Sequence, residues 1–207
     1  MSRIPMWLSI LNPERELKAD IDQSRWHDPA SYPDWWIERS ASLFEMLRRS
    51  SNAVGVSSYS EYGCGPNRPF GAVVDRQDPN IKRHSLDLRR WADDVIECNL
   101  DNLTIENLPP QSDCGVLSGV VEYLQDAART FALLANAHRY LLISYCCADF
   151  EKAKSPKNQI ALIAGRVKMG WRNHMTLVEF IAATHSFGYI CKIELWRHQV
   201  LVLVAKN

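Results

Sequence analysis

A chain of 207 residues is long enough for one domain of ordinary size with a real hydrophobic core. Its 24 basic side chains balance its 24 acidic ones, so the charge does not favour a nucleic-acid-binding protein. No apolar run approaches the roughly 20 residues that span a bilayer, and the N-terminus lacks a signal-peptide pattern, which together predict a cytoplasmic protein.

The first 50 residues predict a helical extension. A helix is expected over residues 13–23, where a capping asparagine precedes a proline in the first turn. A second helix should begin near Pro33, because apolar residues recur there at helical spacing: Trp36, Ile37, Leu43, Phe44 and Leu47. The adjacent Trp35 and Trp36 either pack on the main domain or form the wall of a pocket. We therefore divide the chain into an N-terminal helical extension or lid, residues 1–50, and a main domain, residues 51–207.

From residue 54 onward, short apolar strands alternate with helical or loop segments, as in a parallel sheet. A weak alternating pattern places the first strand over residues 54–60. Within residues 66–76 the pattern fits a short helix with Pro69 in its first turn; the competing interpretation is a strand over residues 71–74 that ends in Asp75. Further strands are expected over residues 84–88, 95–98, 113–118 and 140–145.

The C-terminal part adds helices and a strand pair. Thr176 followed by Glu179 is a capping-box pattern, which begins a helix that runs to about residue 186. The other expected elements are a helix over 125–138, a basic connection over 148–172 with helical turns near 159–167, and an antiparallel hairpin of strands 189–195 and 199–205. The fold class is therefore α/β: a three-layer, Rossmann-like, mostly parallel sheet with a C-terminal antiparallel strand hairpin.

The turn after the first strand carries the clearest functional signal. Its sequence is Glu61-Tyr-Gly-Cys-Gly-Pro66, in which Gly63 and Gly65 let the backbone turn sharply or approach a ligand. A dinucleotide-binding fingerprint requires a third glycine where this chain has Arg68, and a P-loop sequence is also absent. The pattern therefore disfavours NAD and ATP as ligands.

An acidic residue at the end of the second strand would complete a nucleoside site. Asp87 lies 22 residues after Gly65, near the spacing of about 20 residues at which an acid binds ribose hydroxyls. Asp75 lies only 10 residues after Gly65, too few for a helix and a strand. A carboxylate suits a diol because it accepts two hydrogen bonds. We therefore assign this role to Asp87.

In these features residues 54–207 resemble the class I S-adenosylmethionine-dependent methyltransferases. The resemblance rests on Glu61–Pro66, the strand-end Asp87, Cys98-Asn99-Leu100, and the segment Val116–Leu124 after the fourth predicted strand. It implies S-adenosyl-L-methionine as cofactor and O- or N-methylation by in-line displacement. Pro66-Asn67 departs from the family, in which a further glycine is common.

The resemblance also implies a role for each matching position. Glu61, Tyr62, Gly63 and Gly65 would lie against the methionine part of the cofactor, Asp87 would hold the ribose hydroxyls, Leu88, Asn99 and Leu100 would flank the adenine, and Ser118 and Gly119 would line the cofactor beside the reacting methyl group. Many relatives have an aspartate where this chain has Asn99.

The acceptor side is expected outside this common core, in residues 1–50 and 148–175. Trp171-Arg172-Asn-His174 precedes the last helix, so His174 is a candidate base and Arg172 a candidate anion contact; alternatively, His174 only lies near the helix cap. Glu122 and Tyr123 either face the substrate or begin a helix whose dipole favours an acid. The tryptophans and basic residues suit a small, partly anionic or glycan-like acceptor.

Two further expectations come from the whole chain. The six cysteines form no C-x-x-C pair and are not clustered with histidines, which predicts buried, reduced thiols and no metal site. The alternative function is a non-catalytic binding or scaffolding protein that has the methyltransferase fold with a decayed site.

Overall fold

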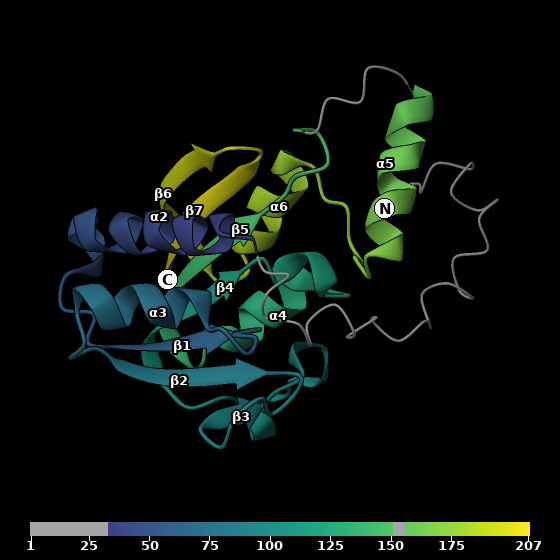
Figure 1. The fold of residues 1–207 in the computed structure, drawn as a ribbon. Helices are drawn as coiled ribbons and strands as arrows, with labels where there is room; N and C mark the ends of the chain where they lie inside the picture. Colours follow the sequence, from purple (N-terminus) through teal and green to yellow (C-terminus); the bar gives the residue numbers. More distant parts are fainter. Residues whose placement is uncertain (1–32, 151–155) are drawn as a thin grey trace.

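The computed structural model describes residues 33–150 and 156–207, which form a seven-stranded sheet with helices on both faces (Figure 1). The helix predicted over residues 13–23 lies outside the described residues. The strands are β1 (Ser58–Tyr62), β2 (Lys82–Asp87), β3 (Val95–Glu97), β4 (Ser112–Ser118), β5 (His138–Tyr145), β6 (Gly188–Trp196) and β7 (Gln199–Lys206). The helices are α2 (Trp35–Arg49), α3 (Pro69–Gln77), α4 (Ala127–Leu134), α5 (Pro156–Lys168) and α6 (Leu177–Thr184), with short 3-10 helices η4 (Ser51–Ala53), η5 (Leu100–Asn102), η6 (Ile105–Asn107) and η7 (Val121–Tyr123).

The strand order is β3-β2-β1-β4-β5-β7-β6. The first five strands in this order are parallel, whereas β7 runs antiparallel to both of its neighbours, β5 and β6. The order reverses between β1 and β4, which is the position where open α/β sheets bind ligands beyond the strand ends. The predicted Rossmann-like sheet with a C-terminal hairpin is therefore confirmed.

Two apolar cores, one on each face of the sheet, hold the three layers together. On one face α2 and α3 pack on the sheet through Leu43, Phe44 and Phe70. On the other face α4 and α6 do so, and the rings of Tyr145 and Phe180 stack with centroids 4.8 Å apart. α5 stands apart from the sheet in Figure 1. This arrangement leaves the carboxyl ends of β1, β2 and β4 free for a site.

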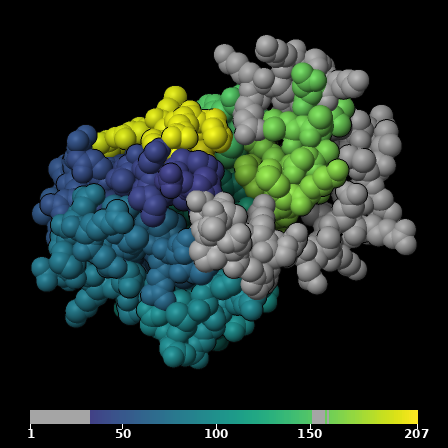
Figure 2. Space-filling model, in the orientation of Figure 1, coloured from purple at the N-terminus to yellow at the C-terminus, as the bar shows by residue number. Residues whose placement is uncertain are grey.

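Helix α2 is part of this layered body. Its apolar stripe, predicted from the sequence, is buried at Leu43, Phe44 and Leu47. Figure 2 shows α2, in purple, lying between the yellow C-terminal strands and the blue-green surface of α3. Although α2 precedes the predicted main domain in sequence, it shares one core with the sheet. The boundary at residue 50 stays a prediction.

The structure moves several predicted boundaries and decides between the two alternatives for residues 66–76. The first strand begins at Ser58 rather than Val54, because Gly55 has a φ of +81° and the chain still turns there. Residues 69–77 form a helix with Pro69 in its first turn, so the alternative strand ending at Asp75 is wrong. The helix predicted over 125–138 is limited to Ala127–Leu134, since Asp126 caps its N-terminus by accepting a hydrogen bond from the Arg129 amide.

The C-terminal predictions are confirmed more closely. Thr176 and Glu179 form the capping box at the start of α6, each side chain accepting a hydrogen bond from the other residue's backbone amide. The predicted helical turns of the basic connection form α5.

All six cysteines are free thiols, four of them buried. Within residues 33–150 and 156–207, no helix combines the length and apolarity needed to cross a membrane, and no cluster of potential metal ligands occurs.

Candidate functional site

A cavity of about 580 Å³ lies where the parallel strands end. Its walls include residues at or just after the ends of β1, β2, β3 and β4, namely Tyr62, Asp87, Cys98 and Ser118. Cavities that bind small molecules have volumes of roughly 300–1,000 Å³, and in open α/β sheets they occur at this edge. Ten positions were expected at the cofactor from the sequence. The structure brings nine of them to this cavity: Tyr62, Gly63, Gly65, Asp87, Leu88, Asn99, Leu100, Ser118 and Gly119.

The glycine turn after β1 forms one wall and depends on its missing side chains. Gly63 and Gly65 have φ values of +59° and +60°, a region that glycine enters without steric cost. A Cβ on Gly63 would also lie 2.6 Å from Cγ2 of Val120, which follows β4. The turn therefore has to be narrow at this point, and the glycines allow β1 and β4 to end close together around the cavity.

Asp87 connects this turn to the end of β2. Its Oδ2 accepts a hydrogen bond from the Gly65 amide at 2.7 Å, and burial raises the pKa of its carboxyl group. Asp75, the other candidate, instead forms an exposed ion pair with Arg83 at 2.9 Å and does not line the cavity. The structure thus places Asp87, and not Asp75, where an acid can meet a ligand.

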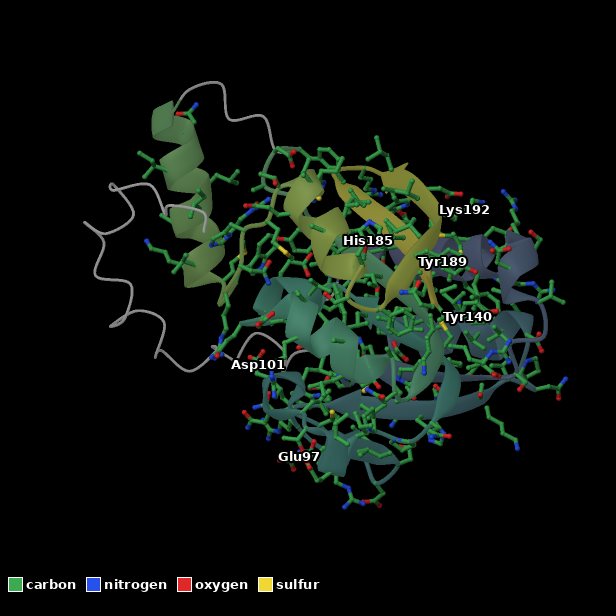
Figure 3. All side chains as sticks on the ribbon, turned by 180° about the vertical axis from the view of Figure 1, so that it is seen from behind. Glu97, Asp101, Tyr140, His185, Tyr189 and Lys192 are labelled. Carbon is green, nitrogen blue, oxygen red and sulfur yellow. The ribbon has the colours of Figure 1, made fainter. Side chains whose placement is uncertain are left out.

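Residues after β2 and β3 form a wall with both apolar and amide groups. Leu88 and Leu100 contribute apolar surface, and Asn99 caps η5 by accepting a hydrogen bond from the Asp101 amide at 3.0 Å. Asp101, labelled in Figure 3, forms an ion pair with Arg172 at 3.3 Å, so a predicted acceptor-side residue also reaches this wall.

Arg39 of α2 is a cavity residue that the sequence did not indicate. Its side chain is 5% exposed, and its guanidinium donates to Oγ and to the carbonyl oxygen of Ser118 at 3.0 and 3.1 Å. A Cβ on Gly119, whose φ is +72°, would lie 2.7 Å from this guanidinium, so only glycine leaves room for it. No local pattern predicts this contact, because Arg39 and Ser118 are 79 residues apart.

The rest of the cavity has aromatic walls. Trp35 and Trp36 pack edge to face with ring centroids 6.1 Å apart, and both line the cavity together with Tyr123 and Trp171. The ring of Trp171 lies 4.6 Å from the guanidinium carbon of Arg166. Both sequence readings for the paired tryptophans hold, because they line the cavity and Trp35 also packs on Trp196 of β6, with ring centroids 6.2 Å apart. Such walls favour a ligand with a flat or apolar surface.

Glu61 is the predicted cofactor residue that the structure does not bring to the cavity. Its buried carboxylate accepts hydrogen bonds from the amides of Phe70 and Gly71, each at 3.0 Å, at the start of α3. Burial raises the pKa of this carboxyl group to about 7, although both amide bonds oppose the shift. Glu61 therefore joins the end of β1 to α3 beneath the glycine turn.

His174 also does not line the cavity. Burial, aided by the nearby charge of Arg166, lowers the pKa of its imidazole to about 4. An imidazole with so low a pKa is a weak general base at neutral pH. Its neighbour Asn173 instead anchors the segment, donating to the carbonyl oxygens of Val121 and Leu124 at 2.6 and 2.9 Å.

For the methylation that the sequence resemblance implies, replacing His174 with glutamine is expected to change turnover less than about threefold, because the side chain does not line the cavity. Initial rates of wild type and His174→Gln, measured at several pH values around neutrality, test this. A loss of a hundredfold or more, with unchanged thermal stability, would restore His174 as the base.

Comparisons with known proteins place this geometry in context. No protein-family model and no curated protein matches the sequence. Among solved structures, the mitomycin 7-O-methyltransferase MmcR matches with a TM-score of 0.60 and 13% identity, covering 97% of this chain and 67% of that one. An O-methyltransferase family protein from Burkholderia thailandensis matches with a TM-score of 0.66 and 13% identity, covering 97% of this chain and 69% of that one. A third match is CalO1, the methyltransferase in calicheamicin biosynthesis, in its S-adenosylhomocysteine-bound form. Its TM-score is 0.57 at 15% identity, covering 91% of this chain and 61% of that one.

The fold is therefore that of the S-adenosylmethionine-dependent methyltransferases, as the resemblance implied. This chain spans 61–69% of the length of these three solved chains. At 13–15% identity the likeness concerns the fold, and the chemistry has to be argued from this chain's own side chains.

Proposed function

We propose that this chain is an S-adenosylmethionine-dependent O-methyltransferase that acts on a small-molecule or glycan-like acceptor. The observation that carries the proposal is the carboxylate of Asp87 at the end of β2, hydrogen-bonded to Gly65 in the glycine turn and lining the cavity. A carboxylate beside a narrow glycine turn suits a ribose diol that is joined to a small charged group. The names of the structural neighbours support oxygen as the acceptor atom.

The proposed cofactor position follows the walls described above. Asp87 would accept hydrogen bonds from the ribose hydroxyls, and Leu88, Asn99 and Leu100 would enclose the adenine. The backbone of the glycine turn would face the methionine part, supported from beneath by Glu61. Ser118 and Gly119 would lie beside the methyl group, which S-adenosylmethionine supplies as an electrophile on a sulfonium. In-line transfer then depends mainly on how the acceptor is aligned.

The acceptor would enter between α2 and the segment before α6. Trp35, Trp36 and Trp171 line that part of the cavity, and Arg172 contributes a cation. These residues support the prediction that segments 1–50 and 148–175 form the acceptor pocket. A cytoplasmic location and the absence of nucleic-acid partners stay predictions from the sequence.

Calorimetric titration with S-adenosylhomocysteine, S-adenosylmethionine, NAD and ATP tests this proposal. We expect micromolar binding of the two sulfur compounds and no binding of the other two. A well-folded sample that binds neither sulfur compound would contradict the proposal. Binding of both, without methylation of any compound in a broad hydroxyl library, would favour the non-catalytic alternative.

A further inference from the structure

Glu122 is a buried residue of the cavity wall, in η7, which begins three residues after the last residue of β4. Its side chain is 2% exposed, and Oε1 accepts a hydrogen bond from the Cys146 amide at 3.1 Å. Oε2 has no hydrogen-bond partner among the residues that the structure describes. A buried carboxylate oxygen without a donor is costly. Because Glu122 lines the cavity, a small turn of its side chain would let a bound ligand supply the missing donor.

The backbone fixes Glu122 between the two halves of the cavity. Ser118 and Gly119 precede it by four and three residues. Its own carbonyl oxygen accepts a hydrogen bond from the Arg172 amide at 2.8 Å, next to the aromatic wall at Trp171. The backbone of Glu122 thus links the proposed methyl position to the segment of the proposed acceptor pocket, and its carboxylate lies at the end of β5, against the Cys146 amide.

The surrounding groups permit Glu122 to be charged. Burial raises the pKa of its carboxyl group, while the Cys146 amide and the guanidinium groups of Arg39 and Arg166 favour the ionised form. Tyr145 and Cys147 are also close, and the negative field of Glu122 helps to keep both protonated. In its ionised form, a carboxylate whose pKa is raised by burial is a better proton acceptor than an exposed one.

Arg39 has hydrogen-bonding capacity to spare beside it. Three of its five N–H groups have acceptors among the described residues: Oγ and the carbonyl oxygen of Ser118, and Oε1 of Gln199 at 3.4 Å. Arg39 and Glu122 attract each other and line the same cavity. A bound molecule can therefore give a hydrogen bond to Glu122 and accept one from Arg39.

Resting on the proposed function, we propose that Glu122 is the general base for methyl transfer and that its Oε2 binds the hydroxyl of the acceptor. The acceptor oxygen forms a bond to the methyl carbon, and the carbon–sulfur bond breaks with its electron pair remaining on sulfur. The hydroxyl proton passes to Oε2 of Glu122 and leaves to solvent after product release. Arg39 holds an oxygen of the same acceptor and positions the carboxylate.

The test compares Glu122→Gln with wild type on catechols of graded acidity. The substituted amide keeps an oxygen for the Cys146 amide but cannot take up a proton. We expect kcat/KM for 4-methylcatechol to fall about a hundredfold or more, since general bases contribute 10²–10⁴-fold. For 4-nitrocatechol, which is ionised at neutral pH, the fall should be less than about threefold. In a pH–rate profile, the wild-type rate on 4-methylcatechol should rise with pH as Glu122 ionises. The profile of Glu122→Gln should lack this rise.

Calorimetry with S-adenosylhomocysteine separates this proposal from the proposed function. Its affinity should be the same in wild type, Glu122→Gln and the exposed control Glu45→Gln. Absence of binding to wild type would contradict the proposed function itself. Intact binding to wild type with at least a tenfold loss in Glu122→Gln would mean that Glu122 holds the cofactor, and would overturn the base assignment. Equal losses on both catechols, or intact binding without turnover of any catechol, would also overturn it.

Discussion

Replacing Asp87 with alanine should weaken the binding of S-adenosylhomocysteine at least about a hundredfold. The proposed ribose diol loses two hydrogen bonds to a charged acceptor, each worth about 1.5–3 kcal/mol, and tenfold in affinity corresponds to about 1.4 kcal/mol. The Gly65 amide also loses its acceptor, 2.7 Å away, so the glycine turn is less well held. Calorimetric titration of the purified variant measures the loss.

Two further variants make this result specific. Asp75→Ala removes an exposed carboxylate that pairs with Arg83 outside the cavity, and its affinity should match wild type within about twofold. Asp87→Asn retains an acceptor for the Gly65 amide without the charge, so its affinity should lie between those of Asp87→Ala and Asp75→Ala. Equal affinity in Asp87→Ala and Asp75→Ala, with both proteins folded, would show that Asp87 does not contact the cofactor.

Glu61 should make the stability of the protein depend on pH. Its carboxyl pKa is raised from 4.5 to about 7 by burial, so the folded state holds a proton that the unfolded state releases between these values. The stabilisation is therefore complete below pH 4.5 and is lost as the pH rises through 7. A shift of this size corresponds to about 3 kcal/mol in the free energy of unfolding, at 1.36 kcal/mol per pKa unit.

Glu61→Gln is expected to remove this pH dependence, because an amide does not titrate. Urea unfolding at pH 5, 6, 7 and 8 measures the effect as the difference between wild type and variant. Glu45→Gln, on the exposed part of α2, should follow the wild-type curve. If the free energy of unfolding of Glu61→Gln changed between pH 5 and 8 in the same way as that of wild type, Glu61 would have an ordinary pKa despite its burial.

Those parts of the molecule that local chemistry determines were predictable from the sequence. The capping box at Thr176, the proline in the first turn of α3 and the Gly63–Gly65 turn each depend on neighbouring residues only. The choice of Asp87 over Asp75 followed from the length of one β-α-β unit. These features were enough to predict the sheet, the edge at which the cavity lies and most of the positions in one part of the cavity wall.

Contacts between distant segments were not predictable in the same way. The position of Arg39 depends on how α2 crosses the sheet, and that is set by a core shared with Phe70, Val116 and Leu142. Glu61 looked like a ligand residue because it precedes the glycines, but its side chain points to the amides of α3. Glu122 stayed ambiguous because sequence does not show that its carboxylate is buried, or that one oxygen has no partner among the described residues.

The insertion of β7 between β5 and β6 has a consequence for synthesis on the ribosome. Until residues 199–206 emerge, β5 is an open edge with an apolar sequence, and the oxygen that Gln199 offers to Arg39 is missing. That last bond joins positions 160 residues apart. A nascent chain therefore exposes a strand edge prone to intermolecular pairing, and completes its cavity only after the final strand enters the sheet.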